Sequence, residues 1–188
     1  MKPTGHLQIF KVYEDGEEEL HFDQNNIITS GLGVGFSYLF SGAGSDDIVD
    51  YQIRNFLVGS GVTDATDYSA STFKLKAGLD SVDSWGDETS LIIEPYYPIE
   101  SGSIAGALVP FARIRFSNIH KVTNTSVRYT LVLDRNTLNG KYLNEVGLFM
   151  RNPKGSASPN PILVAYRPFT EITKTSDFSL LFRWTLQF

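Results

Sequence analysis

The sequence predicts a mainly β protein, an antiparallel β-sandwich of the jelly-roll kind, built as a single domain over residues 1–188. Apolar and polar residues alternate through the last stretch of the chain, and similar stretches recur earlier, separated by turn residues. The chain contains 16 glycines, 13% aromatic residues and only 20% charged residues, which suits strands and turns around an aromatic core. We expect one short helix near residues 31–40 and a long excursion over residues 60–108.

The final stretch, residues 178–188, is the clearest strand. Its sequence FSLLFRWTLQF places apolar residues at alternate positions, namely Phe178, Leu180, Phe182, Trp184, Leu186 and Phe188. Side chains of a strand point to opposite faces with a period of two, so one face here is apolar and the other mostly polar. A helix would scatter these aromatic rings around its circumference. We therefore expect a long, well-paired strand packed against a second layer.

The first elements form a predicted β-hairpin. Residues 5–13 alternate roughly, Asp15-Gly16 is a turn signal, and residues 17–22 return. Five acidic residues surround this turn, and the simplest interpretation is a solvated hairpin end. The alternative is contact with a cation or a basic partner, for which Glu17 and Glu18 are candidate interface residues.

Residues 31–40 carry the only predicted helix. Apolar side chains fall at helical spacing, at Leu32, Phe36, Leu39 and Phe40. The G-x-G-x-G pattern that starts at Gly31 superficially resembles a nucleotide loop. It lacks a βαβ context and a Gly-Lys-Ser/Thr ending, so we interpret these glycines as close packing of a helix on a sheet.

A surface loop at 41–50 and a strand at 51–59 precede the 60–108 excursion. Loops of this length in compact domains usually have a function or form an interface. Trp85, Tyr96 and Tyr97 are therefore candidate contact residues, although the two tyrosines, which stand beside prolines, equally fit packing under the preceding loop.

The C-terminal half repeats the pattern of strand and turn. Strands are expected at residues 109–116, 127–134, 142–150 and 162–169, the last of them broken by Pro168. Turns or loops are expected at residues 118–126, 139–140, 151–161 and 170–177.

The residues that usually carry chemistry form no recognisable constellation. A net charge of −5 argues against a general nucleic-acid binder, and the lack of cysteine excludes disulfides, thiolate metal sites and a cysteine nucleophile. His6, His21 and His120 stand far apart, and the acidic loops at 46–50 and 80–88 lack calcium-loop spacing. No signal peptide and no apolar run of membrane-spanning length is visible. We expect a non-enzyme without cofactor, metal, nucleic acid or membrane span.

Several stretches, in order, resemble a family of proteins. They are NNIITSGLG at residues 25–33, FLVGSG at 56–61, NEVGLFMRN at 144–152 and ILVAYRPFTEITKTSDFSLLFRWTLQF at 162–188. This series is similar to small structural proteins of tailed-phage virions, of the tail, baseplate and fibre-attachment kind. The resemblance rests on the order of the motifs and on the C-terminal ending, and it does not extend to residues 62–108.

The resemblance implies a β-sandwich without catalysis that docks into a repeated assembly. The function it implies is that of a tail or baseplate protein that anchors fibres or neighbouring subunits through strand-edge and loop contacts. Its partners would be other phage structural proteins and copies of itself, in a virion assembled in the host cytoplasm. Two alternatives stay open: a neck, collar or capsid-decoration protein, and a carbohydrate-binding module recognising a host surface through Trp85, Tyr96 and Tyr97.

Overall fold

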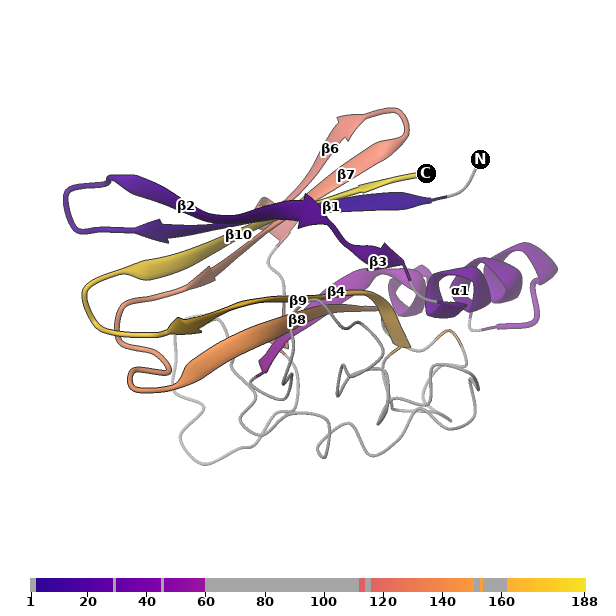
Figure 1. Ribbon diagram of the computed structural model, residues 1–188. Helices are drawn as coiled ribbons and strands as arrows, with labels where there is room; N and C mark the ends of the chain where they lie inside the picture. Colours follow the sequence, from indigo (N-terminus) through magenta and orange to yellow (C-terminus); the bar gives the residue numbers. More distant parts are fainter. Residues whose placement is uncertain are drawn as a thin grey trace.

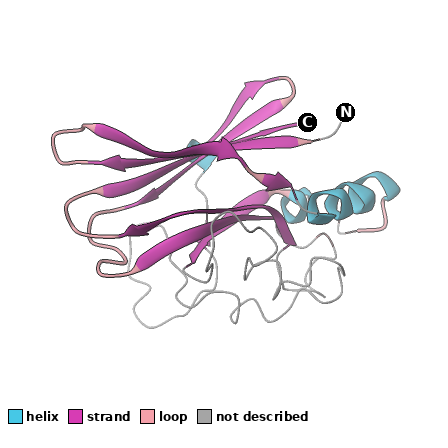
Figure 2. Cartoon of the chain, viewed as in Figure 1, coloured by secondary structure: helices cyan, strands magenta, loops and turns pink. Residues whose placement is uncertain are grey.

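The computed structural model describes residues 3–28, 30–44, 46–59, 112–113, 116–150, 153 and 162–188. Within them the chain forms two antiparallel sheets that lie one over the other, with one helix at one end (Figures 1 and 2). The first sheet, called sheet A, has the order β2-β1-β10-β7-β6, and the second, called sheet B, has the order β3-β9-β8-β4-β5. The predicted antiparallel sandwich is confirmed.

Sheet A is built around the C-terminal strand. It consists of β1 (Thr4–Val12), β2 (Glu18–Asn25), β6 (Ile119–Thr123), β7 (Ser126–Leu133) and β10 (Ser179–Gln187). β10 lies between β1 and β7 and pairs with both along its length. Leu180, Phe182, Trp184 and Leu186 are fully buried, as the period-two pattern predicts.

Sheet B consists of β3 (Ile27–Ile28), β4 (Ile53–Gly59), β5 (Ala112–Arg113), β8 (Tyr142–Met150) and β9 (Ile162–Thr173). The strand predicted at residues 162–169 does not end at Pro168, because β9 continues to Thr173, but its register against β8 shifts between Pro168 and Ile172. Among the described residues, β3 pairs with β9 only at Tyr166 and Ala165, so Pro168 lies beyond β3 and is paired with β8 alone. A proline is tolerated in a strand where one edge is unpaired.

The stretch expected to be one turn, residues 118–126, contains β6, which pairs with β7 across a tight turn at residues 124–125. The sequence does not predict β6 because four of its five residues are exposed. Its residues therefore do not alternate between apolar, buried positions and polar, exposed ones. Within the strand expected at 109–116, the described residues form only β5 and the start of a 3₁₀ turn, η5 (Phe116–Asn118). The loop at 41–50 likewise contains most of a 3₁₀ turn, η1 (Ile48–Tyr51).

The predicted helix is α1 (Ser30–Ser41), which packs against β9. The predicted close packing is confirmed at Gly35, where an added Cβ atom would lie 2.5 Å from the Sδ and Cε atoms of Met150. At Gly33 the same atom would meet open space. Among the described residues, no helix combines the length and the apolar character needed to cross a membrane.

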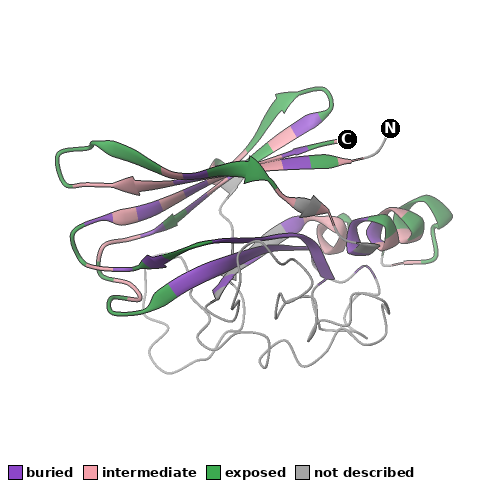
Figure 3. Cartoon of the chain, viewed as in Figure 1, coloured by how far each residue is buried: buried purple, intermediate pink, exposed green. Residues whose placement is uncertain are grey.

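The core lies between the two sheets. Aromatic rings link them: the centroid of Phe169 on β9 lies 6.3 Å from that of Phe182 on β10 and 6.2 Å from that of Phe22 on β2. Each fully buried side chain of this size contributes about 1.5–3 kcal/mol relative to exposure. Figure 3 shows how burial is concentrated in the central strands, while the hairpin ends and the far end of α1 are exposed.

Candidate interaction surfaces

The turn between β1 and β2 adopts the tight geometry that its sequence predicts. The Tyr13 amide donates to the Glu17 carbonyl at 3.0 Å, and the Gly16 amide donates to the Tyr13 carbonyl at 3.1 Å. Gly16 has a φ of 87°, a conformation that glycine adopts without steric cost. The Asp15 carboxylate accepts a further bond from the Glu17 amide. The tip is therefore held by its own backbone.

Most acidic side chains of this hairpin are paired with basic residues. Arg183 on β10 donates to both oxygens of Glu18, at 2.8 and 3.0 Å, and Arg135 lies 3.4 Å from Glu14. Glu17 has no hydrogen bond or ion pair through its carboxylate within the part of the chain that the structure describes. Of the two candidate acids, Glu18 is thus tied to the sheet, and Glu17 is exposed to solvent.

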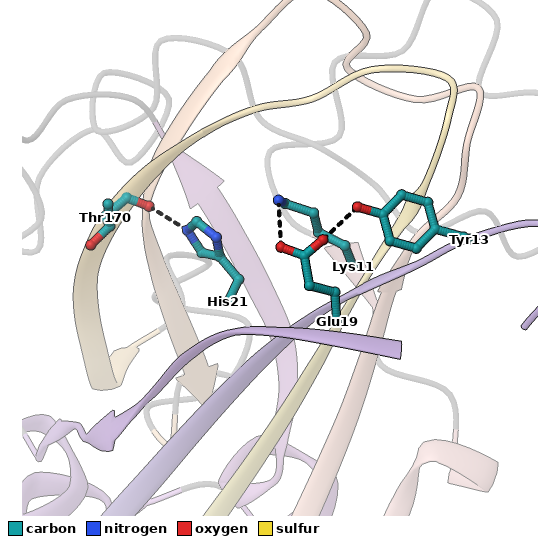
Figure 4. Close-up of polar contacts among 5 residues, drawn as sticks. All are labelled: Lys11, Tyr13, Glu19, His21 and Thr170. Atoms are coloured by element: carbon teal, nitrogen blue, oxygen red, sulfur yellow. Dashed lines mark hydrogen bonds and ion pairs between the residues drawn. The ribbon is translucent and has the colours of Figure 1, made fainter. Parts of the chain in front are cut away.

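A polar cluster lies near the hairpin end of the sandwich (Figure 4). Glu19 accepts a hydrogen bond from the Tyr13 hydroxyl at 2.5 Å and from the Lys11 ammonium at 3.1 Å. The Nε2 atom of His21 lies 3.0 Å from the carbonyl oxygen of Thr170 on β9. Since a carbonyl only accepts, Nε2 carries the proton, and this bond joins sheet A to sheet B.

The hydrogen bonds of this cluster shift the pKa values of two of its members, Glu19 and Tyr13. The hydrogen bond from Tyr13, and then the one from Lys11, lowers the pKa of Glu19 below its ordinary value. The same contact with Glu19 raises the pKa of the Tyr13 hydroxyl. A general base or acid at neutral pH works best with a pKa near 7, and both shifts move away from that value. Among the described residues, no group of three or more His, Asp or Glu side chains could hold a metal ion.

Lys174 joins two loops at the same end of the sandwich. Its side chain is fully buried, and its ammonium donates to the carbonyl oxygens of Arg135 and Thr175 and to Oδ1 of Asn139, at 3.3, 2.6 and 3.2 Å. The ammonium also lies 5.3 Å from the centre of the Phe178 ring. All three donors of the amine are used, so its role is to hold the β7–β8 turn against the β9–β10 turn.

The opposite end of the molecule presents apolar side chains to solvent. Leu39 is 40% exposed and Phe40 is 81% exposed, in the last turn of α1, and we call this pair the α1 tip. Phe40 stacks on Phe36 at 5.9 Å, and Phe36 in turn meets Phe188 edge-on at 5.9 Å. Although Leu39 and Phe40 follow the helical spacing of Leu32, they are not part of the core, because the last turn of α1 extends beyond the sheets (Figure 3).

A second apolar feature crosses the outer face of sheet A. The strand registers place Leu20, Phe10, Leu181 and Val132 side by side on β2, β1, β10 and β7. Leu20 and Val132 are 50% and 40% exposed, and the Arg183 guanidinium covers Phe10 at 4.5 Å from the ring centre. We call this row the outer apolar row.

No family model, curated protein or solved structure matches this chain.

The aromatic candidates of the sequence analysis, Trp85, Tyr96 and Tyr97, lie outside the described residues, as does the whole 60–108 excursion. The sequence alone predicts neither the α1 tip nor the outer apolar row, for two reasons. Phe40 fits the apolar face of a helix, and only the length of α1 relative to the sheets exposes it. The outer apolar row involves one residue from each of four strands, so its members become neighbours only through pairing.

Proposed function

We propose that this chain is a non-enzymatic structural component of a tailed-phage virion, a tail or baseplate protein that anchors fibres or neighbouring subunits. The observation that carries the proposal is the α1 tip. α1 contains no charged residue, and its last turn exposes a phenylalanine to 81%. An uncharged helix end with large apolar side chains is typical of a surface that a partner covers.

Two further features support an assembly role. The ordered motifs of the sequence resemble small virion proteins, and the polar cluster at the hairpin end is arranged as a clamp. Burying the α1 tip against a partner would gain about 25 cal/mol for each Å² of apolar surface removed from water. Phe40 already stacks on Phe36, which in turn contacts Phe188, so less side-chain freedom would be lost on docking than for an isolated side chain.

The test is incorporation into particles. Phages carrying Phe40→Ser or Leu39→Ser in this chain should contain much less of it in purified particles, measured by quantitative mass spectrometry. Thermal unfolding of the purified variants should stay close to that of the wild type, because both side chains are exposed. Tyr142→Ser, which removes a side chain of 56% exposure on β8, is the matched control and should incorporate normally.

A cryo-EM map of intact particles locates the chain. Symmetric copies at the tail tip, with the α1 tip buried against another chain, agree with the proposal, whereas copies at the neck or head support the collar or decoration alternative. Absence of the chain from particles contradicts a virion role. Glycan binding that is lost in Trp85→Ala would then favour the carbohydrate-binding alternative.

A further inference from the structure

The two outer strands of sheet A, β2 and β6, each pair with a single strand within the described part of the chain. An edge strand presents unpaired N–H and C=O groups along its free side. Both strands are also poorly covered. Only Phe22 of β2 is buried, and β6 is exposed from His120 to Thr123, on both of its faces. Figure 3 shows the β6–β7 hairpin exposed at its end.

The hairpins to which these two edge strands belong carry opposite charge. The β1–β2 hairpin, residues 4–25, contains six carboxylates and one lysine. The β6–β7 hairpin, residues 119–133, contains Lys121 and Arg128 and no carboxylate. The β2 carboxylates stay accessible despite their internal ion pairs, since the side chains of Glu18, Glu19 and Asp23 are 38%, 47% and 39% exposed.

The topology fixes how these edges can meet. Each neighbouring pair in sheet A is antiparallel, and three strands separate β2 from β6, so these two strands run in the same direction. A rotation about an axis along the strands therefore brings β6 of a second copy beside β2 as a parallel pair. A two-fold axis between like edges would instead place carboxylates against carboxylates, or lysine against lysine, which is unfavourable.

We propose that copies of this chain associate head to tail through sheet A, with the acidic β2 edge of one copy beside the basic β6 edge of the next. The partner in this contact is a second copy of this chain. That the contact forms in a particle rests on the proposed virion role. Because the two surfaces differ, a pair of copies joined in this way keeps one free β2 edge and one free β6 edge. Such heterologous contacts produce rings or helical stacks of copies.

Sedimentation velocity of the purified full chain tests this contact. The wild type should self-associate with a dissociation constant below about 1 mM. Association should weaken as salt is raised, since salt screens the attraction between exposed charges over a Debye length of about 10 Å at 0.1 M. Lys121→Glu, at an exposed position of β6, and Asp23→Lys, on β2, should each give monomers at the same concentration. Lys141→Glu makes the same charge change as Lys121→Glu, but in the β7–β8 turn, and should associate as the wild type does.

Mixing the two variants separates head-to-tail contact from pairing of like edges. An equimolar mixture of the Lys121→Glu and Asp23→Lys proteins should recover association, because the unaltered acidic edge of one meets the unaltered basic edge of the other. Persistence of wild-type association in either variant alone would overturn the proposal, as would a monomeric wild type or a mixture that stays monomeric. Unchanged thermal unfolding of Lys121→Glu, whose side chain lies on the exposed strand, shows that any loss is not due to misfolding.

The outcomes for this contact and for the virion role are distinct. A chain that is found in particles yet remains monomeric at about 1 mM contradicts the edge contact and leaves the virion role standing. A chain that associates, with the losses and the recovery expected for the Lys121→Glu and Asp23→Lys variants, but is absent from particles contradicts the virion role. The edge contact then still stands.

Discussion

At the scale of single residues, Arg183 holds a partner that is distant in sequence. Glu18 and Arg183 are 165 residues apart and form a two-point contact, and Arg183 also lies over Phe10. Exposed pairs of this kind contribute little to stability, typically 0.2–1 kcal/mol. Their effect here is to hold the β1–β2 hairpin in one position relative to β10.

The Tyr13–Glu19 contact has a consequence that can be measured by pH titration. Tyr13→Phe should raise the pKa of Glu19 toward its ordinary value of 4.5, because the hydroxyl's hydrogen bond is the main cause of the lowered pKa. A lowered pKa in the folded state stabilises the protein above pH 4.5, and this contribution is lost as the pH falls through the folded-state value. In the Tyr13→Phe protein, the free energy of unfolding should therefore change less with pH between the folded-state pKa of Glu19 and its ordinary value.

Carboxyl NMR of the Glu19 side chain gives the first readout, and urea unfolding between pH 3 and 6 gives the second. Tyr142→Phe removes a hydroxyl on β8 and is the control. If Glu19 titrates at the same pH in the wild type and in Tyr13→Phe, the hydrogen bond does not set its pKa.

Lys174 provides a second test at this scale. Lys174→Met keeps the length of the side chain but leaves three oxygen acceptors without their donor, which should cost about 1–3 kcal/mol of unfolding free energy. Lys141→Met, at an exposed position, should change it by no more than about 0.5 kcal/mol. Urea unfolding at neutral pH measures both.

The pH dependence of the Lys174 contribution follows from the direction of its pKa. Burial lowers this pKa from its ordinary value of 10.5, and the carboxylates of Asp134 and Asp177 act in the opposite direction. Between the lowered value and 10.5 the unfolded chain binds more protons than the folded one, so stability rises with pH in that window. The difference in unfolding free energy between wild type and Lys174→Met should widen there. A constant difference up to pH 10.5 would contradict the lowered pKa.

At the scale of elements, the two halves of α1 lie in different surroundings, one against the sheet and one in solvent. Its first half packs on the sheet, with Leu32 and Gly35 buried, and its last turn is exposed. Its glycines therefore differ in role although they lie two residues apart. Gly35 allows close approach to Met150, whereas Gly33 has no neighbour within 4 Å of a Cβ position.

This difference predicts opposite effects of one substitution. Gly33→Ala should stabilise the protein by about 0.5–1 kcal/mol, because alanine is the better helix former and the added methyl group meets open space. Gly35→Ala should destabilise it by about 1–3 kcal/mol, because the methyl group displaces the Met150 side chain in a packed region. Chemical denaturation of both variants measures the two changes. Equal effects at the two positions would show that Gly35 does not lie against the Met150 side chain as described.

At the scale of the whole molecule, the order of strands places β10 at the centre of sheet A and leaves β6 at an edge. Within sheet A, β10 is therefore paired on both sides, with β1 and with β7, whereas β6 pairs with β7 alone among the described residues. The N- and C-terminal strands, β1 and β10, are therefore paired neighbours in one sheet (Figure 1).

Native-state hydrogen exchange should reproduce this order. Backbone amides of β10 that bond to β1 or β7 should exchange slowest, through global unfolding, and those of β6 should exchange much faster. NMR of the dilute monomer measures the rates residue by residue. Protection of β6 equal to that of β10 under these conditions would contradict the arrangement of sheet A.

The sequence by itself determined the local structure. Alternation at residues 178–188 identified a central strand, and the spacing of apolar residues at 31–40 identified the helix. Asp15-Gly16 identified a hairpin turn. Strand and helix periods of two and 3.6 residues can be detected because they depend only on residues close together in the sequence. Of the proposed contact residues, it placed Glu17 and Glu18 at an exposed tip.

Only the tertiary structure decided which residues meet. It paired Glu18 with Arg183, carried β9 through Pro168, added β6 as an exposed edge, and left Phe40 in solvent although its spacing fits a buried face. These outcomes depend on strand order and on where one element ends relative to another. They are set by contacts between residues far apart in sequence, and no local period encodes such contacts.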